Sequence, residues 1–176
     1  MKNKKIKSPL IILTIVFSSL IVVFLTISII TSVLLVKRCE DAIADIGEIK
    51  LEVEVENKID QAEDYYSKLD TNISLDKRVN NIETLKDAKY NYVRLAIKKA
   101  NVSYSRRVVD NISEEDIKKY VNNANQVLEK YFTTDEYENI EGYKDFKGLL
   151  DIYKEEKSSG GNQTAPESQA EEPEIC

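Results

Sequence analysis

Histidine and tryptophan are absent from this chain of 176 residues, and cysteine occurs only twice. Without histidine the chain can form neither a Ser–His nor a Cys–His nucleophile pair, and it offers no imidazole ligand to a metal ion. Paired carboxylates, such as Glu63 with Asp64 or Glu136 with Glu138, could serve acid–base chemistry or a hard cation, but their spacing is that of any solvated helix face. We therefore expect no catalytic, cofactor-binding or metal-binding residues, and a protein that is not an enzyme.

Glycine and proline are also scarce. The five glycines form neither a G-x-G-x-x-G sequence nor a phosphate-binding loop. The three prolines are Pro9, Pro166 and Pro173, so the long stretch between the first two lacks the strongest helix breaker. This absence favours helices throughout the centre of the chain.

One long apolar run is present. Residues 10–36 carry no charge, and all of them are Leu, Ile, Val or Phe except for seven Ser and Thr. A helix of this length spans roughly 40 Å, compared with about 30 Å for the hydrocarbon core of a bilayer. The Ser and Thr hydroxyls can donate hydrogen bonds back to the helix backbone. The run predicts a transmembrane helix.

Two other interpretations of this region are a cleaved secretory signal and a lipoprotein signal. The apolar region of a secretory signal usually has only about 7–15 residues. Lipoprotein processing at Cys39 would need small uncharged residues before the cysteine, where this chain has Lys37 and Arg38. An uncleaved signal anchor is therefore the favoured interpretation.

The charges that flank the run predict its orientation. Four lysines and the amino terminus precede it, whereas only Lys37 and Arg38 follow it closely. By the positive-inside rule, the amino terminus is cytoplasmic and the rest of the chain lies outside the cell membrane. We thus expect a single-pass protein of the cell membrane with an extracytoplasmic domain.

A capping sequence marks one helix start clearly. Ser113 occupies an N-cap position with Asp116 three residues later, and Ile112 and Ile117 occupy the positions of a hydrophobic staple. Apolar residues then recur at helical spacing. The pattern predicts a helix over about residues 114–132.

A similar sequence follows this helix. Thr133 and Glu136 have the same spacing and predict a further helix that begins near residue 134. Gly142 and Gly148 weaken that helix and could divide it.

The region upstream is less clear. Helical spacing predicts a helix over residues 79–100, with Ser74 as its cap, and a shorter helical segment over residues 59–69. Residues 48–56 alternate between charged and apolar side chains, as a half-buried strand does. A lone strand would leave its backbone groups unpaired. We therefore predict a helix that continues out of the membrane span, with a strand as the alternative.

Together these signals predict an all-α protein in four parts. Residues 1–9 are a short basic amino terminus, and residues 10–36 are the transmembrane helix. Residues 37–157 form an antiparallel three- to four-helix bundle with coiled-coil-like packing. Residues 158–176 are a polar, acidic tail that we expect to be disordered.

Positive charge gathers in one segment. Residues 77–107 hold nine basic and two acidic residues, between two acidic segments. The favoured interpretation is that this helix complements its acidic neighbours. The alternative is a binding face for anionic headgroups, wall polymer or an acidic partner, formed by Lys86, Lys89, Arg94, Lys98 and Lys99. Nucleic acid is disfavoured by the net charge of −6 and by the expected side of the membrane.

The two cysteines, Cys39 and Cys176, stand at the ends of the exported part. Either could form an intermolecular disulfide, and a cytoplasmic Cys39 could be lipidated, although cysteines without a partner are the simpler expectation. Four N-x-Ser/Thr sequons are also present, and the sequence leaves open whether they are used.

The function that fits these features is a non-catalytic interaction or scaffold subunit, anchored in a membrane or cell-envelope complex. Its expected partners are the lipid bilayer and a membrane or envelope protein, and self-association is a further option. The alternative is an extracytoplasmic ligand-sensing or binding module that works through a partner. The nine residues before the span are too few for an output domain of its own.

Overall fold

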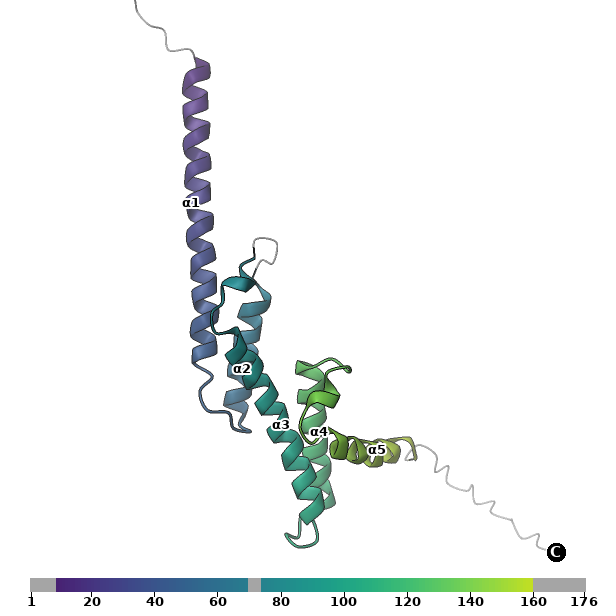
Figure 1. The fold of residues 1–176 in the computed structure, drawn as a ribbon. Coiled ribbons are helices and arrows are strands. Elements are labelled where there is room, and N and C mark those ends of the chain that lie inside the picture. Colours follow the sequence, from purple (N-terminus) through teal and green to yellow (C-terminus); the bar gives the residue numbers. More distant parts are fainter. Residues whose placement is uncertain (1–8, 70–73, 160–176) are drawn as a thin grey trace, which may run out of the picture. The chain divides into compact units, whose positions relative to one another are not determined.

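The computed structural model describes residues 9–69 and 74–159 (Figure 1). In these two ranges there are five α-helices, two short 3-10 turns and no strand, which confirms the predicted helical class. The chain divides inside helix α3 (Ile82–Arg106) into two compact units, residues 1–92 and 93–176. The sequence suggested one bundle over residues 37–157, whereas the structure distributes these residues over unit 1 and unit 2. Each unit is described by itself.

Unit 1 begins with α1 (Pro9–Ala44), which is long and apolar enough to cross a membrane. Its hydroxyl side chains donate hydrogen bonds to carbonyls one turn back, as Thr26 Oγ1 does to Val22 O at 2.8 Å. Such bonds let polar residues sit in an apolar environment. The helix does not stop at the end of the apolar run but continues for two more turns.

The prediction that this helix runs on through residues 48–56 is wrong. Helix α1 ends at Ala44, and α2 (Val53–Ser67) begins only after a loop in which Gly47 adopts a φ of +70°. Glycine reaches this left-handed conformation without the steric cost that other residues have. The alternating residues form no strand either, because they divide between the loop and the first turn of α2.

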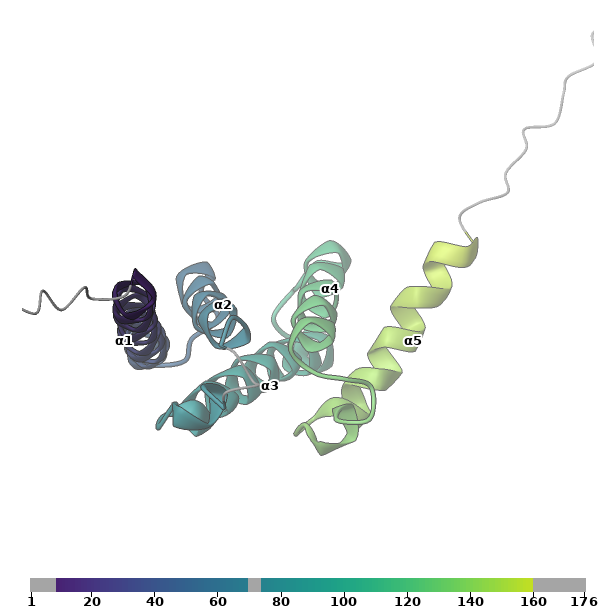
Figure 2. The ribbon, with the colours of Figure 1, turned by 90° about the horizontal axis from the view of Figure 1, so that it is seen from above.

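The break lets α2 fold back along α1, and the two helices lie side by side in Figures 1 and 2. A 3-10 turn, η1 (Asp76–Arg78), then leads into α3. The predicted cap at Ser74 is wrong, because Ser74 lies in a turn with a φ of 55° and α3 starts eight residues later. The core of unit 1 is formed by Cys39, Ile43, Ile46, Val55, Ile59, Ala62, Leu69, Leu75, Val79, Leu85, Ala88 and Tyr92.

Unit 2 contains the second half of α3, followed by α4 (Glu114–Tyr131). The predicted start of α4 is confirmed, because the backbone N–H of Asp116 donates to Ser113 Oγ at 3.1 Å. Ile117 of the predicted staple is fully buried. The predicted apolar stripe of this helix therefore faces the core of unit 2.

The second predicted helix starts later than expected. Glu136 Oε2 accepts the backbone N–H of Thr133 at 2.8 Å, but only a 3-10 turn, η2 (Tyr137–Asn139), follows. Gly142, with a φ of +84°, separates this turn from α5 (Tyr143–Ser159). A Cβ at this glycine would lie 3.4 Å from Ile97 Cγ2, so the chain also approaches α3 closely here.

The core of unit 2 comes from α3, α4, α5 and Ile140, the residue after η2. Its buried side chains are Val93, Ala96, Ile97, Ala100, Ile117, Val121, Ala124, Val127, Leu128, Ile140, Tyr143, Phe146, Leu149, Leu150 and Tyr153. Helix α5 continues to Ser159, two residues past the predicted end of the bundle. The rest of the predicted tail, residues 160–176, lies outside the described residues.

Candidate interaction site

The predicted basic residues of α3 that lie in unit 1 pair with nearby acids. Lys89 Nζ lies 2.9 Å from Glu63 Oε2 of α2, and the Lys89 side chain is only 18 % exposed. Lys86 Nζ lies 2.7 Å from Glu83 Oε1 of α3 itself. Of these two residues, Lys89 thus complements an acid of a neighbouring helix, whereas Lys86 pairs within α3.

In unit 2 the other three residues have different surroundings. Arg94 Nη1 donates to Glu141 Oε2 at 2.8 Å, and this hydrogen bond and charge lower the pKa of the Glu141 carboxyl. The Lys99 ammonium lies 4.4 Å from the ring centroid of Tyr120 on α4, within cation–π range. Lys98 is exposed.

The five basic residues do not share one face of α3. Each residue of an α-helix turns it by roughly 100°, so Lys89 and Lys98 point to opposite sides of the helix axis. A common binding face for a flat anionic surface is therefore not formed by this set, although single members remain accessible. The sequence could not resolve this point because a run of charge does not show the angle between its members.

Cys39 is fully buried in the core of unit 1. A disulfide or an attached acyl chain would require this part of the core to open. Cys176, the other residue of the prediction, lies outside the described residues. Of the acidic residues considered for chemistry, Glu63 pairs with Lys89, and Glu136 accepts the backbone N–H of Thr133. Within residues 9–69 and 74–159, no group of three or more potential metal ligands gathers.

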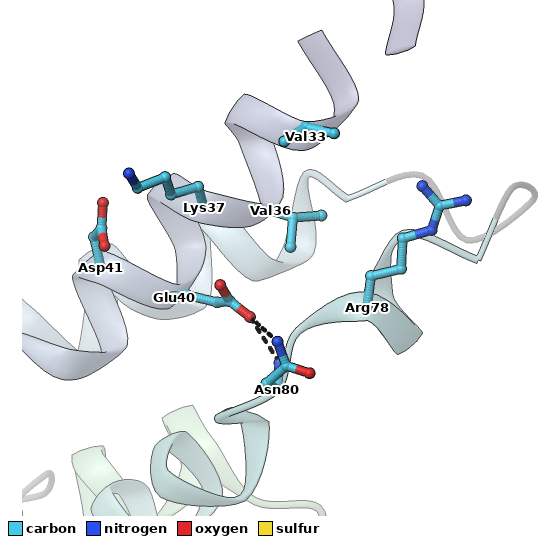
Figure 3. Close-up of a pocket in the computed structure, with 7 residues that line it drawn as sticks. All are labelled: Val33, Val36, Lys37, Glu40, Asp41, Arg78 and Asn80. Carbon is cyan, nitrogen blue, oxygen red and sulfur yellow. Dashed lines mark hydrogen bonds between the residues drawn. The ribbon is translucent and has the colours of Figure 1, made fainter. Parts of the chain in front are cut away.

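A polar connection joins the end of α1 to the start of α3 (Figure 3). Glu40 Oε1 accepts the backbone N–H of Asn80 at 2.9 Å and the Asn80 side-chain amide at 2.8 Å. Asn81 Nδ2 donates to the backbone carbonyl of Glu40 at 3.0 Å. These three bonds fix the segment after η1 against the turn of α1 that follows the apolar run.

A pocket of about 350 Å³ lies beside this connection. Val33 and Val36 line its apolar side, and Lys37, Asp41 and Arg78 contribute charged groups. Sequence reasoning did not find this pocket, because Arg78 and Asn80 come from a short turn with no helical period.

Unit 2 carries an exposed apolar turn between α3 and α4. The side chains of Val108 and Val109 are 85 % and 80 % exposed, and Val102 on the last turns of α3 is 45 % exposed. Arg106 pairs with Asp110 at 3.1 Å, and the Arg107 guanidinium lies 4.0 Å from the centroid of the Tyr104 ring. We call Val108 and Val109 the valine turn. Two adjacent valines between polar residues are the signal in the sequence that could have predicted it.

Comparisons with known proteins give no guide to function: no family model, curated protein or solved structure matches this chain. The functional inference therefore depends on the residues of this chain alone.

Proposed function

We propose that this protein is a single-span membrane subunit without catalytic activity, which holds a helical interaction module next to the bilayer. One observation carries the proposal: α1 is an uninterrupted helix that supplies both the apolar run and the buried residues Cys39 and Ile43 of unit 1. A helix that is at once anchor and core leaves no flexible linker between them. Unit 1 would then be fixed at the membrane surface.

The length of the apolar run supports this placement. Its roughly 40 Å exceed the roughly 30 Å of a hydrocarbon core, which leaves the equivalent of about six or seven residues outside. Near the end of the run, Ser32, Leu35 and Val36 are half-buried, whereas the residues before them are exposed. Unit 1 thus covers the part of the run that a bilayer of ordinary thickness would not cover.

The valine turn supports an interaction role for unit 2. Exposed apolar side chains that adjoin one another mark contact sites more often than isolated ones do. Burying a valine side chain contributes about 1.5 kcal/mol or more, so two of them give a partner protein a useful apolar contact. We place this turn outside the cell and the amino terminus in the cytoplasm, on the lysine asymmetry of the flanks.

The test is photo-crosslinking in intact cells of the source organism. A photoreactive amino acid at Val109 should give one discrete adduct, whose second member is identified by mass spectrometry. The control position is Asn122 on α4, which is also exposed but polar. Replacing Val108 by Ser in the Val109 probe should abolish the adduct without changing the helical circular dichroism. Equal adducts from both positions, or none from Val109, would overturn the interaction role.

The orientation has its own test. A variant with Asn122→Cys as its only cysteine should react with a membrane-impermeant maleimide in intact cells, with the outer membrane permeabilised if there is one. Reaction that requires lysis of the inner membrane would reverse the orientation and make the module a cytoplasmic adaptor.

One feature favours the alternative of a ligand-binding module. A groove of about 260 Å³ in unit 1 is lined by Ile43, Ile46, Ile49 and Ala88 together with smaller and polar residues. Sites for small molecules usually have about 300–1,000 Å³. The groove is smaller than that range. The pocket of about 350 Å³ beside Glu40 falls within it, but two of its lining residues, Val33 and Val36, belong to the apolar run, so it does not support a ligand-sensing role away from the membrane.

A further inference from the structure

The groups that line the pocket at the end of α1 change from apolar to positive to negative along the helix. Val33 and Val36 belong to the apolar run, Lys37 is the first charged residue after it, and Asp41 lies one turn further along the helix. At about 1.5 Å per residue, Lys37 and Asp41 are separated by roughly 6 Å along the axis. Apolar surface, positive charge and negative charge thus follow one another with increasing distance from the predicted span.

A second cation comes from a different element. Arg78 belongs to η1, and in the view of Figure 3 its side chain and that of Lys37 flank Val36. The Arg78 side chain extends toward the end of the pocket at which Val33 lies. Arginine and lysine are the side chains that bind phosphate oxygens best, arginine as a planar fork and lysine as a point charge.

Neither cation is neutralised by a carboxylate within the described ranges. The ion pairs there involve other lysines and arginines, and the Glu40 carboxylate is held by Asn80 rather than by Lys37 or Arg78. The Asp41 carboxylate likewise joins none of these ion pairs. The pocket therefore presents two cations and two carboxylates, of which Glu40 is already engaged with Asn80 and Asp41 is open to a charged ligand.

We propose that this pocket holds the headgroup of a bilayer phospholipid that carries both a phosphate and a primary ammonium, as phosphatidylethanolamine does. The acyl chains lie along Val33 and Val36, Lys37 and Arg78 bind the phosphate, and Asp41 accepts the ammonium. The order of groups along the lipid matches the order along α1. This assignment rests on the proposed membrane anchoring, because only a helix in the bilayer brings the pocket to the headgroup layer.

The Glu40–Asn80 connection explains why the site would be specific. It holds the backbone after η1 against α1, so the two cations come from two elements whose backbones are fixed to each other. Only the side chains then remain to be ordered when the lipid binds. The lipid would in turn fasten η1 and the start of α3 to the membrane surface.

The experiment uses the full-length protein, reconstituted in nanodiscs that contain equal amounts of phosphatidylethanolamine, phosphatidylglycerol and phosphatidylcholine. After release into mild detergent, native mass spectrometry reports the lipids that remain bound. We expect one retained phosphatidylethanolamine per chain. Arg78→Gln should lower its retention by roughly tenfold, the factor that corresponds to one lost charge-assisted hydrogen bond. Asp41→Asn should remove the preference for phosphatidylethanolamine over phosphatidylglycerol.

The matched control is Lys77→Gln, which removes an exposed cation from the neighbouring position of η1 without touching the pocket. It should retain lipid as the unmodified protein does. Equal losses in Lys77→Gln and Arg78→Gln, or a preference for phosphatidylglycerol in the unmodified protein, would overturn the proposal. Circular dichroism checks that each variant is folded.

Membrane anchoring is measured separately, by flotation of the same proteins with lipid vesicles. Full flotation without retained phosphatidylethanolamine refutes the lipid site alone. A failure to float refutes the anchoring itself, and the lipid site with it.

Discussion

The two units differ in how their helices are specified. In unit 2, helix α4 starts at a Ser113 cap whose hydrogen bond lies within four residues of sequence. In unit 1, helix α2 starts at Glu52, which makes no side-chain capping bond, and α2 is instead placed by packing against α1. The start of α4 is therefore set by a local signal, and the position of α2 by contacts between distant segments.

The same contrast holds for polar contacts. Unit 1 is held together by polar contacts between residues far apart in the sequence. A hydrogen bond joins Glu40 of α1 to Asn80 before α3, and an ion pair joins Lys89 of α3 to Glu63 of α2. Unit 2 also has distant bonds, such as that from Asn101 Nδ2 to the Gly142 carbonyl at 3.0 Å, which joins α3 to the residue before α5. The comparison teaches that the α1 contacts should be decisive for unit 1 and dispensable for unit 2.

The largest expected loss of stability comes from truncating one buried side chain in the core of each unit. Phe146→Ala should lower the free energy of unfolding of unit 2 by about 3–5 kcal/mol, and Ile43→Ala that of unit 1 by about 2–4 kcal/mol, because both side chains are buried and each truncation leaves a cavity. Hydrogen exchange followed by mass spectrometry should locate each loss in its own unit.

The control for this pair is Val53→Ala at the start of α2, where the side chain is 74 % exposed. It should change stability by less than about 0.5 kcal/mol. If Ile43→Ala raised exchange in α4 and α5 as strongly as in α2, the separation of the two cores would be wrong.

An intermediate effect tests the contrast in helix starts. Ser113→Ala should destabilise unit 2 by about 1 kcal/mol, because it removes the acceptor of the Asp116 N–H. Glu52→Ala at the corresponding position of α2 should cost less than about 0.5 kcal/mol, since no capping bond is lost. Thermal unfolding followed by circular dichroism measures both, and equal losses would contradict the contrast.

A further effect appears only at high pH and comes from Tyr92 of unit 1. The Tyr92 hydroxyl donates to Glu56 Oε2 at 3.2 Å, and burial together with the Glu56 charge raises the pKa of Tyr92 from 10.0 to about 12. Between these values the unfolded chain loses the proton while the folded chain keeps it, so stability falls as the pH rises from about 10 to about 12.

Tyr92→Phe should remove this contribution and flatten the loss of stability in denaturant titrations across that pH range. Tyr65→Phe serves as the control, because it removes a tyrosine of α2 without the Glu56 contact. An unchanged slope in Tyr92→Phe would contradict the assignment.

The sequence predicted what short-range patterns encode. The apolar run, the Ser113 cap and the buried stripe of α4 were all found in this way, since each needs only residues within a few turns of one another. The loop at Gly47 was missed because a single glycine in a charged segment does not show whether the helix ends there and the chain reverses direction. The late starts of α3 and α5 were missed because a capping residue followed by helical spacing does not show that only a 3-10 turn, η1 or η2, forms first.

The candidate sites were likewise predictable only where their residues lie close together in the sequence. A run of basic residues left a binding face on α3 as the alternative interpretation, but its members have different partners. The pocket at the end of α1 combines residues some forty positions apart, and no local pattern could have joined them. By contrast, the two valines of the valine turn are adjacent in the sequence. Only their exposure in the structure indicates a contact site.

The central claim is that α1 is a bilayer anchor in its apolar run and a core helix of unit 1 in its last two turns. A nitroxide scan of single cysteines along residues 10–44, in reconstituted protein with Cys39→Ala and Cys176→Ser as the background, tests it most directly. The account predicts high oxygen accessibility on all sides of the helix through about residue 31. Beyond that point, accessibility should vary with the helical period and reach minima at positions 39 and 43. A helical period from residue 10 onward would make α1 a core helix throughout, and access of a water-soluble relaxing agent along the whole run would exclude a membrane span; either result would contradict the account.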